Sequence, residues 1–142
     1  MARAGVAAPV IWYVAYGSNL LASRFAEYVG DVPREQRRVT LPFARYFARD
    51  ATGTRWGAGG VAFLDPATPA ETLGRAYLLD EERFARLHAD EGPWYPLMLD
   101  LAPIDGVAAR TFTSAERLPD NPPGEAYLRT VRAGEEETWR LP

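Results

Sequence analysis

The sequence predicts an α+β fold in which a mixed, mainly antiparallel β-sheet or small barrel is flanked by helices. Strand-like runs outnumber helical patterns, and neighbouring runs are joined by short connections. In addition, Asp105-Gly106 lies between two alternating runs, which is a strong hairpin signal. With 142 residues the chain is expected to form a single domain over residues 1–142. A chain of this length buries about two-thirds of its unfolded surface in one core.

The amino-terminal stretch predicts a buried strand, a tight turn and a helix. Residues 10–14 form a dense β-branched and aromatic run that ends near Gly17. Ser18 and Asn19 follow and can cap a helix, and apolar residues then recur at helical spacing, namely Leu20, Leu21, Phe25 and Tyr28. Such a turn leaves backbone N–H groups unpaired, so it is a potential binding place for a carboxylate or phosphate.

This turn alone does not decide between binding and a purely structural role. Strand–turn–helix joints with Ser or Asn caps are common, and most of them bind nothing. The lone Gly17 excludes the dinucleotide-binding fingerprint, and no Gly-Lys-Ser/Thr ending of a phosphate-binding loop is present.

The middle of the chain predicts three strands separated by loops. A polar loop is expected over residues 30–38, and a strand follows over residues 39–47 with a break at Pro42. Residues 50–60 contain four glycines and one tryptophan, which indicates a long loop that can border a pocket. A short strand over residues 60–64 should end at Asp65-Pro66, and another strand is expected over residues 73–79.

The second half contains the clearest helix. Asp80 is a good cap for a helix over residues 81–91, and Gly92-Pro93 should stop it. Two antiparallel strands are expected over residues 94–101 and 107–113, then a proline-rich loop over residues 118–124. A short helix over residues 125–133 should follow, with the tail from Gly134 folding back onto the surface.

Glu91 is the candidate catalytic residue. It shares one face of the predicted helix with Phe84, Leu87 and His88, at spacings of i, i+3, i+4 and i+7. An inward-facing glutamate at the carboxyl end of a helix is disfavoured as an anion by burial and by the helix dipole, and both effects raise its pKa. A raised pKa suits a general base near neutral pH. The alternative is a last-turn glutamate that bends into water or pairs with an arginine, and His88 is interpreted as a packing residue.

Composition excludes several classes of function. The chain has no cysteine and one histidine, so thiolate catalysis and cysteine- or histidine-based metal sites are not expected. We therefore expect no metal and no cofactor. A net charge of −3 and a pI near 5.2 argue against a nucleic-acid surface. No apolar run has membrane-spanning length, and the first nine residues lack the apolar core of a signal peptide, which makes a cytoplasmic protein the default expectation.

The two candidate motifs together resemble the gamma-glutamylcyclotransferase family. The resemblance rests on two motifs. Tyr16-Gly17-Ser18-Asn19 follows the first strand, and Asp90-Glu91-Gly92 lies midway along the chain, with Tyr95 shortly after. The region from Pro122 to Gly134, which includes Tyr127, is similar to the closing region of that family. The resemblance spans most of residues 10–135.

The resemblance implies a small mixed barrel with flanking helices and an anion pocket at one mouth. It also implies release of 5-oxoproline from a small gamma-glutamyl amide, an activity linked to glutathione metabolism, by attack of the substrate's own amine. By position, Glu91 would be the general base, and the backbone of Gly17, Ser18 and Asn19 would hold the substrate carboxylate or the oxyanion. Tyr16 and Tyr127 would be pocket hydroxyls.

Departures from the family pattern leave the substrate open. Phe112 stands where several family members have a tyrosine, and the stretch from Arg38 to Pro66 resembles a bacterial side branch. Alternatives are a related enzyme that strips a gamma-glutamyl group from a modified amine, and a non-catalytic carboxylate-binding module on the same fold. A monomer or homodimer without nucleic-acid or membrane partners is expected.

Overall fold

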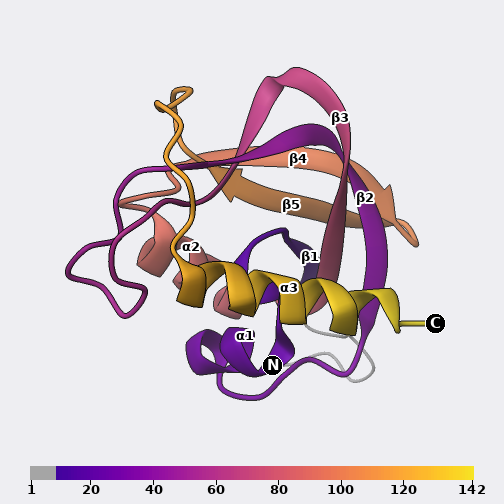
Figure 1. The fold of residues 1–142 in the computed structure, drawn as a ribbon. Coiled ribbons are helices and arrows are strands. Elements are labelled where there is room, and N and C mark those ends of the chain that lie inside the picture. The colour runs from indigo at the N-terminus through magenta and orange to yellow at the C-terminus, as the bar shows by residue number, and fades with distance from the viewer. Residues whose placement is uncertain (1–8) are drawn as a thin grey trace.

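The computed structural model describes residues 9–142 and contains a five-stranded mixed sheet in the order β2-β3-β1-β5-β4 (Figure 1). Neighbouring strands are antiparallel except β1 and β5, which are parallel. The mainly antiparallel α+β class is thereby confirmed. The elements in chain order are β1 (Val10–Ala15), the 3₁₀ turn η1 (Ser18–Leu20), α1 (Ala22–Val29), β2 (Gln36–Ala48), β3 (Val61–Asp80), α2 (Glu81–Glu91), β4 (Leu97–Ile104), β5 (Val107–Thr113) and α3 (Glu125–Trp139).

The sheet curls into a half-barrel. The long strands β2 and β3 bend strongly over its upper part, and α3 crosses in front of it in the view of Figure 1. The sheet order runs from β2 at one edge to β4 at the other without closing on itself among the described residues. The expected barrel is therefore an open one.

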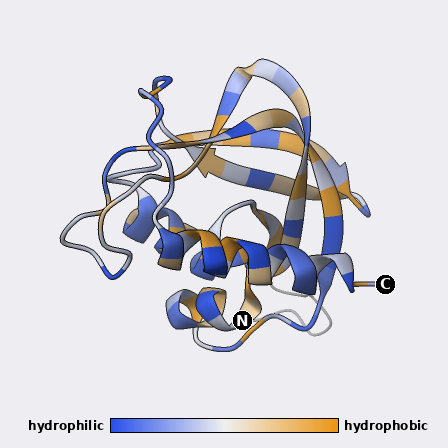
Figure 2. Cartoon of the chain, in the orientation of Figure 1, coloured by the Kyte–Doolittle hydropathy of each residue, from blue (hydrophilic) through white to orange (hydrophobic). Residues whose placement is uncertain are grey.

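The central strand β1 supplies both faces of the core. Trp12 and Val14 belong to one buried cluster, whereas Ile11 and Tyr13 belong to a second cluster with Phe84 of α2. This alternation is the period-two pattern of a strand that is covered on both sides. Figure 2 shows the corresponding bands of apolar and polar residues along the strands and helices.

Two predicted strand breaks are wrong. β2 already begins at Gln36, inside the predicted polar loop, and continues through Pro42, while β3 runs without interruption past Asp65-Pro66. The register shifts on both sides of Phe43, which pairs with Pro69, whereas Ala44 pairs with Asp65. The extra residues of β3 therefore form a bulge, where a proline removes no ladder hydrogen bond.

The predicted end of the last helix is also wrong. α3 continues through Gly134 to Trp139 and does not give way to a folded-back tail. A Cβ atom on Gly134 would lie 2.5 Å from the backbone nitrogen of Leu21. Gly134 is thus a contact residue that lets α3 approach the η1–α1 junction, and its low helix propensity is overridden by this packing.

The local signals with a defined geometry are confirmed. Oδ1 of Asp80 accepts a 2.7 Å hydrogen bond from the backbone N–H of Arg83 and so caps α2. Asp105 and Gly106 have φ values of 49° and 75°, as the tight β4–β5 hairpin requires.

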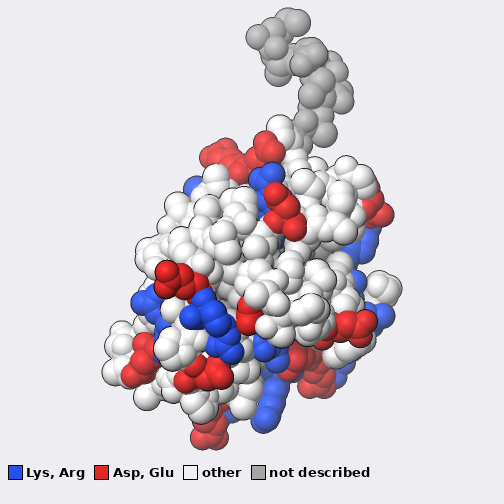
Figure 3. All heavy atoms as spheres, turned by 90° about the horizontal axis from the view of Figure 1, so that it is seen from above, with Lys and Arg blue, Asp and Glu red and all other residues white. Residues whose placement is uncertain are grey.

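The charges on the molecular surface are mixed in the view from above. Figure 3 shows acidic and basic side chains interspersed on that face. Within residues 9–142, no helix is both long and apolar enough to cross a membrane. The expectation about a signal peptide concerns mainly residues 1–8, which lie outside the described residues.

Candidate active site

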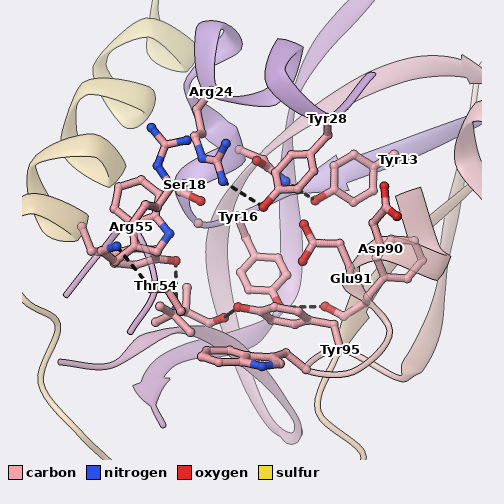
Figure 4. Close-up of a pocket in the computed structure, with 18 residues that line it drawn as sticks. Tyr13, Tyr16, Ser18, Arg24, Tyr28, Thr54, Arg55, Asp90, Glu91 and Tyr95 are labelled. Carbon is pink, nitrogen blue, oxygen red and sulfur yellow. Dashed lines mark hydrogen bonds between the residues drawn. The ribbon is translucent and has the colours of Figure 1, made fainter. Parts of the chain in front are cut away.

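A pocket of about 230 Å³ opens beside the carboxyl end of β1 (Figure 4). Its walls come from η1, α1, the loop over residues 49–60, the end of α2 and the start of α3. All six residues that the sequence singles out line it, namely Tyr16, Gly17, Ser18, Asn19, Glu91 and Tyr127. Their chemical roles remain predictions.

The topology explains why Glu91 lies near the turn. β3 runs antiparallel to β1 and ends at Asp80, which pairs with Val10 at the start of β1. α2 begins there and runs back along β1. A helix of 11 residues is about 16 Å long and β1 is about 20 Å long. The last turn of α2 therefore reaches the level of η1.

The turn itself is built by backbone hydrogen bonds. The N–H groups of Leu20 and Leu21 donate to the carbonyls of Gly17 and Ser18, at 3.0 and 3.2 Å. The prediction that Ser18 or Asn19 caps the helix is wrong, because neither η1 nor α1 has a side-chain cap at its first position. Glu137 of α3 takes this role, since its Oε1 accepts a 2.9 Å hydrogen bond from the N–H of Ala22.

Gly17 is required by close packing. A Cβ atom there would lie 2.8 Å from the Tyr127 hydroxyl and 3.0 Å from Cβ of Ala62. The Tyr127 hydroxyl accepts a 3.0 Å hydrogen bond from the N–H of Ala62. Burial raises the pKa of Tyr127 to about 12, so its hydroxyl keeps its proton at neutral pH.

Two further tyrosines hold the turn in place through their hydroxyl groups. The Tyr16 hydroxyl donates to the carbonyl of Phe112 at 2.6 Å, and the Tyr77 hydroxyl donates to the carbonyl of Asn19 at 2.8 Å. Nδ2 of Asn19 donates to the Tyr13 hydroxyl at 3.2 Å, whereas its buried Oδ1 has no hydrogen-bond partner. Because the Tyr16 hydroxyl already donates its proton to Phe112, it can only accept a hydrogen bond from a ligand.

Glu91 presents its carboxylate to the pocket, as Figure 4 shows. Burial raises the pKa of Glu91 to about 6, while the nearby guanidinium of Arg24 and the polar groups of Asn19 and Tyr28 act in the opposite direction. A carboxyl group with this pKa is mostly ionised at neutral pH and is still a useful proton acceptor and donor.

Arg24 is the residue that sequence reasoning missed. It is only 9% exposed, and its Nη2 donates to the Tyr28 hydroxyl at 2.9 Å. Its guanidinium lies 4.6 Å from the ring centre of Tyr28 and 5.4 Å from that of Trp56, and its Nε has no hydrogen-bond partner. The available signal was spacing, because Arg24 and Tyr28 lie four residues apart on one face of α1.

The loop over residues 49–60 forms the outer wall, as the sequence predicted. Oδ1 of Asp50 accepts hydrogen bonds from the N–H groups of Thr52 and Gly59, at 3.0 and 3.2 Å, which ties the two ends of the loop together. Hydrogen bonds from the Thr52 side chain and from these N–H groups lower the pKa of Asp50. Trp56 stands edge-on to Tyr127 with 5.1 Å between ring centres.

The wall beneath Glu91 is aromatic. The Tyr95 hydroxyl donates to the carbonyl of Ala62 at 3.0 Å, and His88 stacks on Phe112 with 4.5 Å between ring centres. The interpretation of His88 as a packing residue agrees with this contact. Among the described residues, no group of three or more His, Asp or Glu side chains is arranged to hold a metal ion.

Comparison with solved structures decides the fold. A gamma-glutamyl cyclotransferase superposes with a TM-score of 0.74 at 20% identity, over 94% of this chain and 82% of that one. The chain has the gamma-glutamyl cyclotransferase fold. An uncharacterised human protein with a TM-score of 0.73 at 22% identity covers the same shares of the two chains. YkqA from Bacillus subtilis has a TM-score of 0.62 at 20% identity over 94% of this chain and 55% of its own.

Sequence comparison adds one relative outside the solved structures. No protein-family model matches the chain. Histone deacetylase 5 of Arabidopsis thaliana is 33% identical over 199 residues, which covers 98% of this chain and 30% of that protein. The chain thus spans less than a third of this relative, and the gamma-glutamyl cyclotransferase fold is what the comparisons establish.

Proposed function

We propose that this protein is a gamma-glutamyl cyclotransferase that releases 5-oxoproline from a small gamma-glutamyl amide. The observation that carries the proposal is the meeting of a carboxyl group with a raised pKa and the Gly17-Ser18-Asn19 turn in one pocket. The fold it shares with a gamma-glutamyl cyclotransferase supports the same conclusion.

Glu91 is the general base of this reaction. It takes a proton from the α-ammonium of the substrate, and the freed amine attacks the γ-carbonyl carbon to form the ring C–N bond. The amide C–N bond then breaks, and the departing nitrogen receives the proton that Glu91 holds. A second proton, lost from the ring nitrogen, also leaves with the amine, which departs as R-NH₃⁺. A positioned base of this kind contributes about 10²- to 10⁴-fold to the rate.

The backbone of the turn binds the anionic parts of the substrate. The N–H groups of Gly17, Ser18 and Asn19 have no backbone acceptor within the turn, where only the N–H groups of Leu20 and Leu21 are used. In the proposed reaction they bind the α-carboxylate or the oxyanion that develops on the γ-carbonyl, and the N–H of Ser18 also acts on the Tyr127 hydroxyl, whose pKa it lowers. Tyr16 and Tyr127 pack next to this turn and line the same pocket.

The experiment is a mass-spectrometric assay for 5-oxoproline with gamma-glutamyl dipeptides, glutathione and gamma-glutamyl-lysine as donors. Glu91→Gln should lower the rate at least 100-fold, because it removes the base and changes no other pocket group. Glu82→Gln is the matched control, since it removes an exposed carboxylate from the same helix. Equal rates in the two variants would contradict the role of Glu91.

The pH dependence of kcat/KM tests the same assignment. Since the base acts when deprotonated and its pKa is about 6, the rate should rise with pH through a midpoint near 6 and then level off. A profile that falls over this range would rule out a carboxylate base.

A carboxylate-binding module without turnover is the second candidate. The observation that favours it is Phe112 in the pocket wall, where its ring stacks on His88 and supplies no hydroxyl. In that case the wild-type protein and Glu91→Gln would bind a carboxylate ligand alike, and neither would form 5-oxoproline.

A further inference from the structure

Arg45 of β2 contacts the turn from outside the pocket. Its side chain is 20% exposed and lies in the wall of a second hollow, between the strands β2 and β3 and Glu135 of α3. Nη1 of Arg45 donates a 3.1 Å hydrogen bond to the carbonyl oxygen of Tyr16, which lies between the end of β1 and the turn. Arg45 is not one of the residues that line the candidate active site. It can therefore act on a ligand there only indirectly.

The guanidinium of Arg45 is shared between a carboxylate and the backbone. Its Nη2 lies 3.4 Å from the carboxylate of Glu135, whose side chain is 31% exposed. Glu71 of β3 is a second, exposed carboxylate in the wall of the same hollow. Nη1 is bound to the carbonyl of Tyr16 and not to a carboxylate. One nitrogen thus pairs with α3, and the other holds the backbone where the turn begins.

The charge of Arg45 acts inside the pocket in spite of Glu135. The guanidinium carbon lies 5.3 Å from the ring centre of Phe47, and Phe47 stands edge-on to Tyr127 with 6.4 Å between ring centres. Burial raises the pKa of Tyr127, whereas hydrogen bonds from two backbone N–H groups and the positive charge of Arg45 lower it. The Tyr127 hydroxyl lies 2.8 Å from the Cβ position of Gly17, so this charge acts next to the turn.

The peptide unit between Tyr16 and Gly17 connects Arg45 to the ligand side of the turn. None of the described peptide bonds is cis, so the carbonyl of Tyr16 and the N–H of Gly17 point in opposite directions. The carbonyl is directed at Arg45, and the N–H is therefore directed away from it. A cation on the carbonyl oxygen favours the resonance form with positive charge on nitrogen, which makes the N–H a stronger donor.

We propose that Arg45 is a positioning residue of the turn that binds the substrate carboxylate or the oxyanion. It fixes the orientation of the Tyr16–Gly17 peptide and strengthens the N–H of Gly17 as a donor. This inference rests on the proposed function, to which it adds a residue of β2. Glu135 has the opposite effect, because it competes with the carbonyl of Tyr16 for the same guanidinium.

The first test observes this peptide directly. Tyr16-Gly17 is the only Tyr-Gly pair in the sequence, so labelling with ¹³C-carbonyl tyrosine and ¹⁵N-glycine gives a single carbonyl–amide correlation by NMR. In Arg45→Met the carbonyl carbon and the amide nitrogen should both move upfield, because the peptide loses its polarising cation. Glu135→Gln is the matched control. It breaks the same ion pair but keeps the donor to Tyr16, so the correlation should stay in place or move downfield.

The second test measures 5-oxoproline release from gamma-glutamyl-alanine. Arg45→Met should lower kcat/KM about 3- to 10-fold, since polarisation of this kind strengthens a hydrogen bond by about 10–30%. Glu135→Gln should not lower it. The loss in Arg45→Met should be in KM if Gly17 binds the carboxylate, and in kcat if Gly17 binds the oxyanion.

Three results would overturn the role of Arg45: an unmoved correlation in Arg45→Met, an unchanged kcat/KM, or equal losses in Arg45→Met and Glu135→Gln. Equal losses would mean that the ion pair only stabilises the fold. Thermal unfolding of Arg45→Met is measured first. If this variant does not fold, Arg45→Lys replaces it, and a wild-type correlation and kcat/KM in Arg45→Lys would overturn the role, because an ammonium cannot serve Tyr16 and Glu135 as a guanidinium does.

Failure of the proposed function is a separate outcome. If no donor yields 5-oxoproline, that function is wrong, and calorimetry with gamma-glutamyl-alanine then decides on Arg45. Weaker binding by Arg45→Met than by wild type and Glu135→Gln would support its role at the turn. Equal binding by all three proteins, or binding by none, would overturn it.

Discussion

Glu91→Gln should stabilise the folded protein at neutral pH, and this gain should disappear in acid. The pKa of Glu91 is about 6 in the folded state, against 4.5 for a glutamate in the unfolded chain. The pKa is higher in the folded state chiefly because burial disfavours the carboxylate. Between these two values the folded state binds more protons than the unfolded chain. The wild-type protein therefore loses stability as the pH rises through about 6, and glutamine, which stays neutral, does not.

The size of the effect follows from the pKa difference. A rise from 4.5 to about 6 corresponds to about 2 kcal/mol at pH values well above 6, and to almost nothing below 4.5. For a domain of 142 residues this is a Tm difference of about 6 °C at pH 7.5.

Thermal and urea unfolding of the two proteins between pH 4.5 and 8 would measure this difference. Glu82→Gln, on the exposed face of α2, is the control and should show no comparable dependence on pH. A stability difference between Glu91→Gln and wild type that is constant across this range, or that shrinks as the pH rises, would refute the argument that burial raises the pKa of Glu91.

Three further experiments test how the pocket is held. Tyr28→Phe should move the midpoint of the pH–rate profile upward, because the Tyr28 side chain lowers the pKa of the base. Gly17→Ala should abolish 5-oxoproline release and lower Tm, and adding Tyr127→Phe should restore part of both by removing the hydroxyl 2.8 Å from the new Cβ. Glu137→Gln should cost about 1–3 kcal/mol in urea unfolding, since Arg75, only 5% exposed, would lose its anion; an unchanged midpoint would contradict this.

Much of the fold could be predicted because its signals are local. The Asp80 cap and the Asp105-Gly106 turn each depend on residues within four positions of one another, and both have the expected geometry. The errors arose where distant parts of the chain override a local signal. Pro42 lies at a bulge of a long hairpin, and Gly134 lies inside a helix because the chain at Leu21 packs against it.

The two parts of the candidate site, the turn and Glu91, could each be predicted from a local sequence pattern. The turn follows a buried strand, and Glu91 lies on the apolar face of a helix, but nothing local says that two places more than 70 residues apart share a pocket. The resemblance to a family supplied that link. Arg24 was missed because an arginine near the start of a helix is usually exposed to solvent. Only the packing of Tyr28 and Trp56 against it shows that it is buried.

The buried face of α3 explains how the turn is held without a side-chain cap of its own. In most helix starts a side-chain cap fixes the geometry and binds backbone N–H groups. Here four buried positions of α3, spaced by four, three and four residues, form the face that includes the contacts with the turn: Tyr127, Val131, Gly134 and Thr138. Tyr127 packs under Gly17, Gly134 packs on Leu20 and Leu21, and Glu137 receives the first N–H of α1.

The conformation of the turn is therefore imposed from outside, by α3. The same arrangement requires that α3 continue past Gly134, since Glu137 and Thr138 lie beyond it. A helix that ended at residue 133, as local propensity suggested, would leave the N–H of Ala22 without its carboxylate and Arg75 without its ion pair. The glycine that looked like a helix end is thus the residue that allows the helix to hold the pocket.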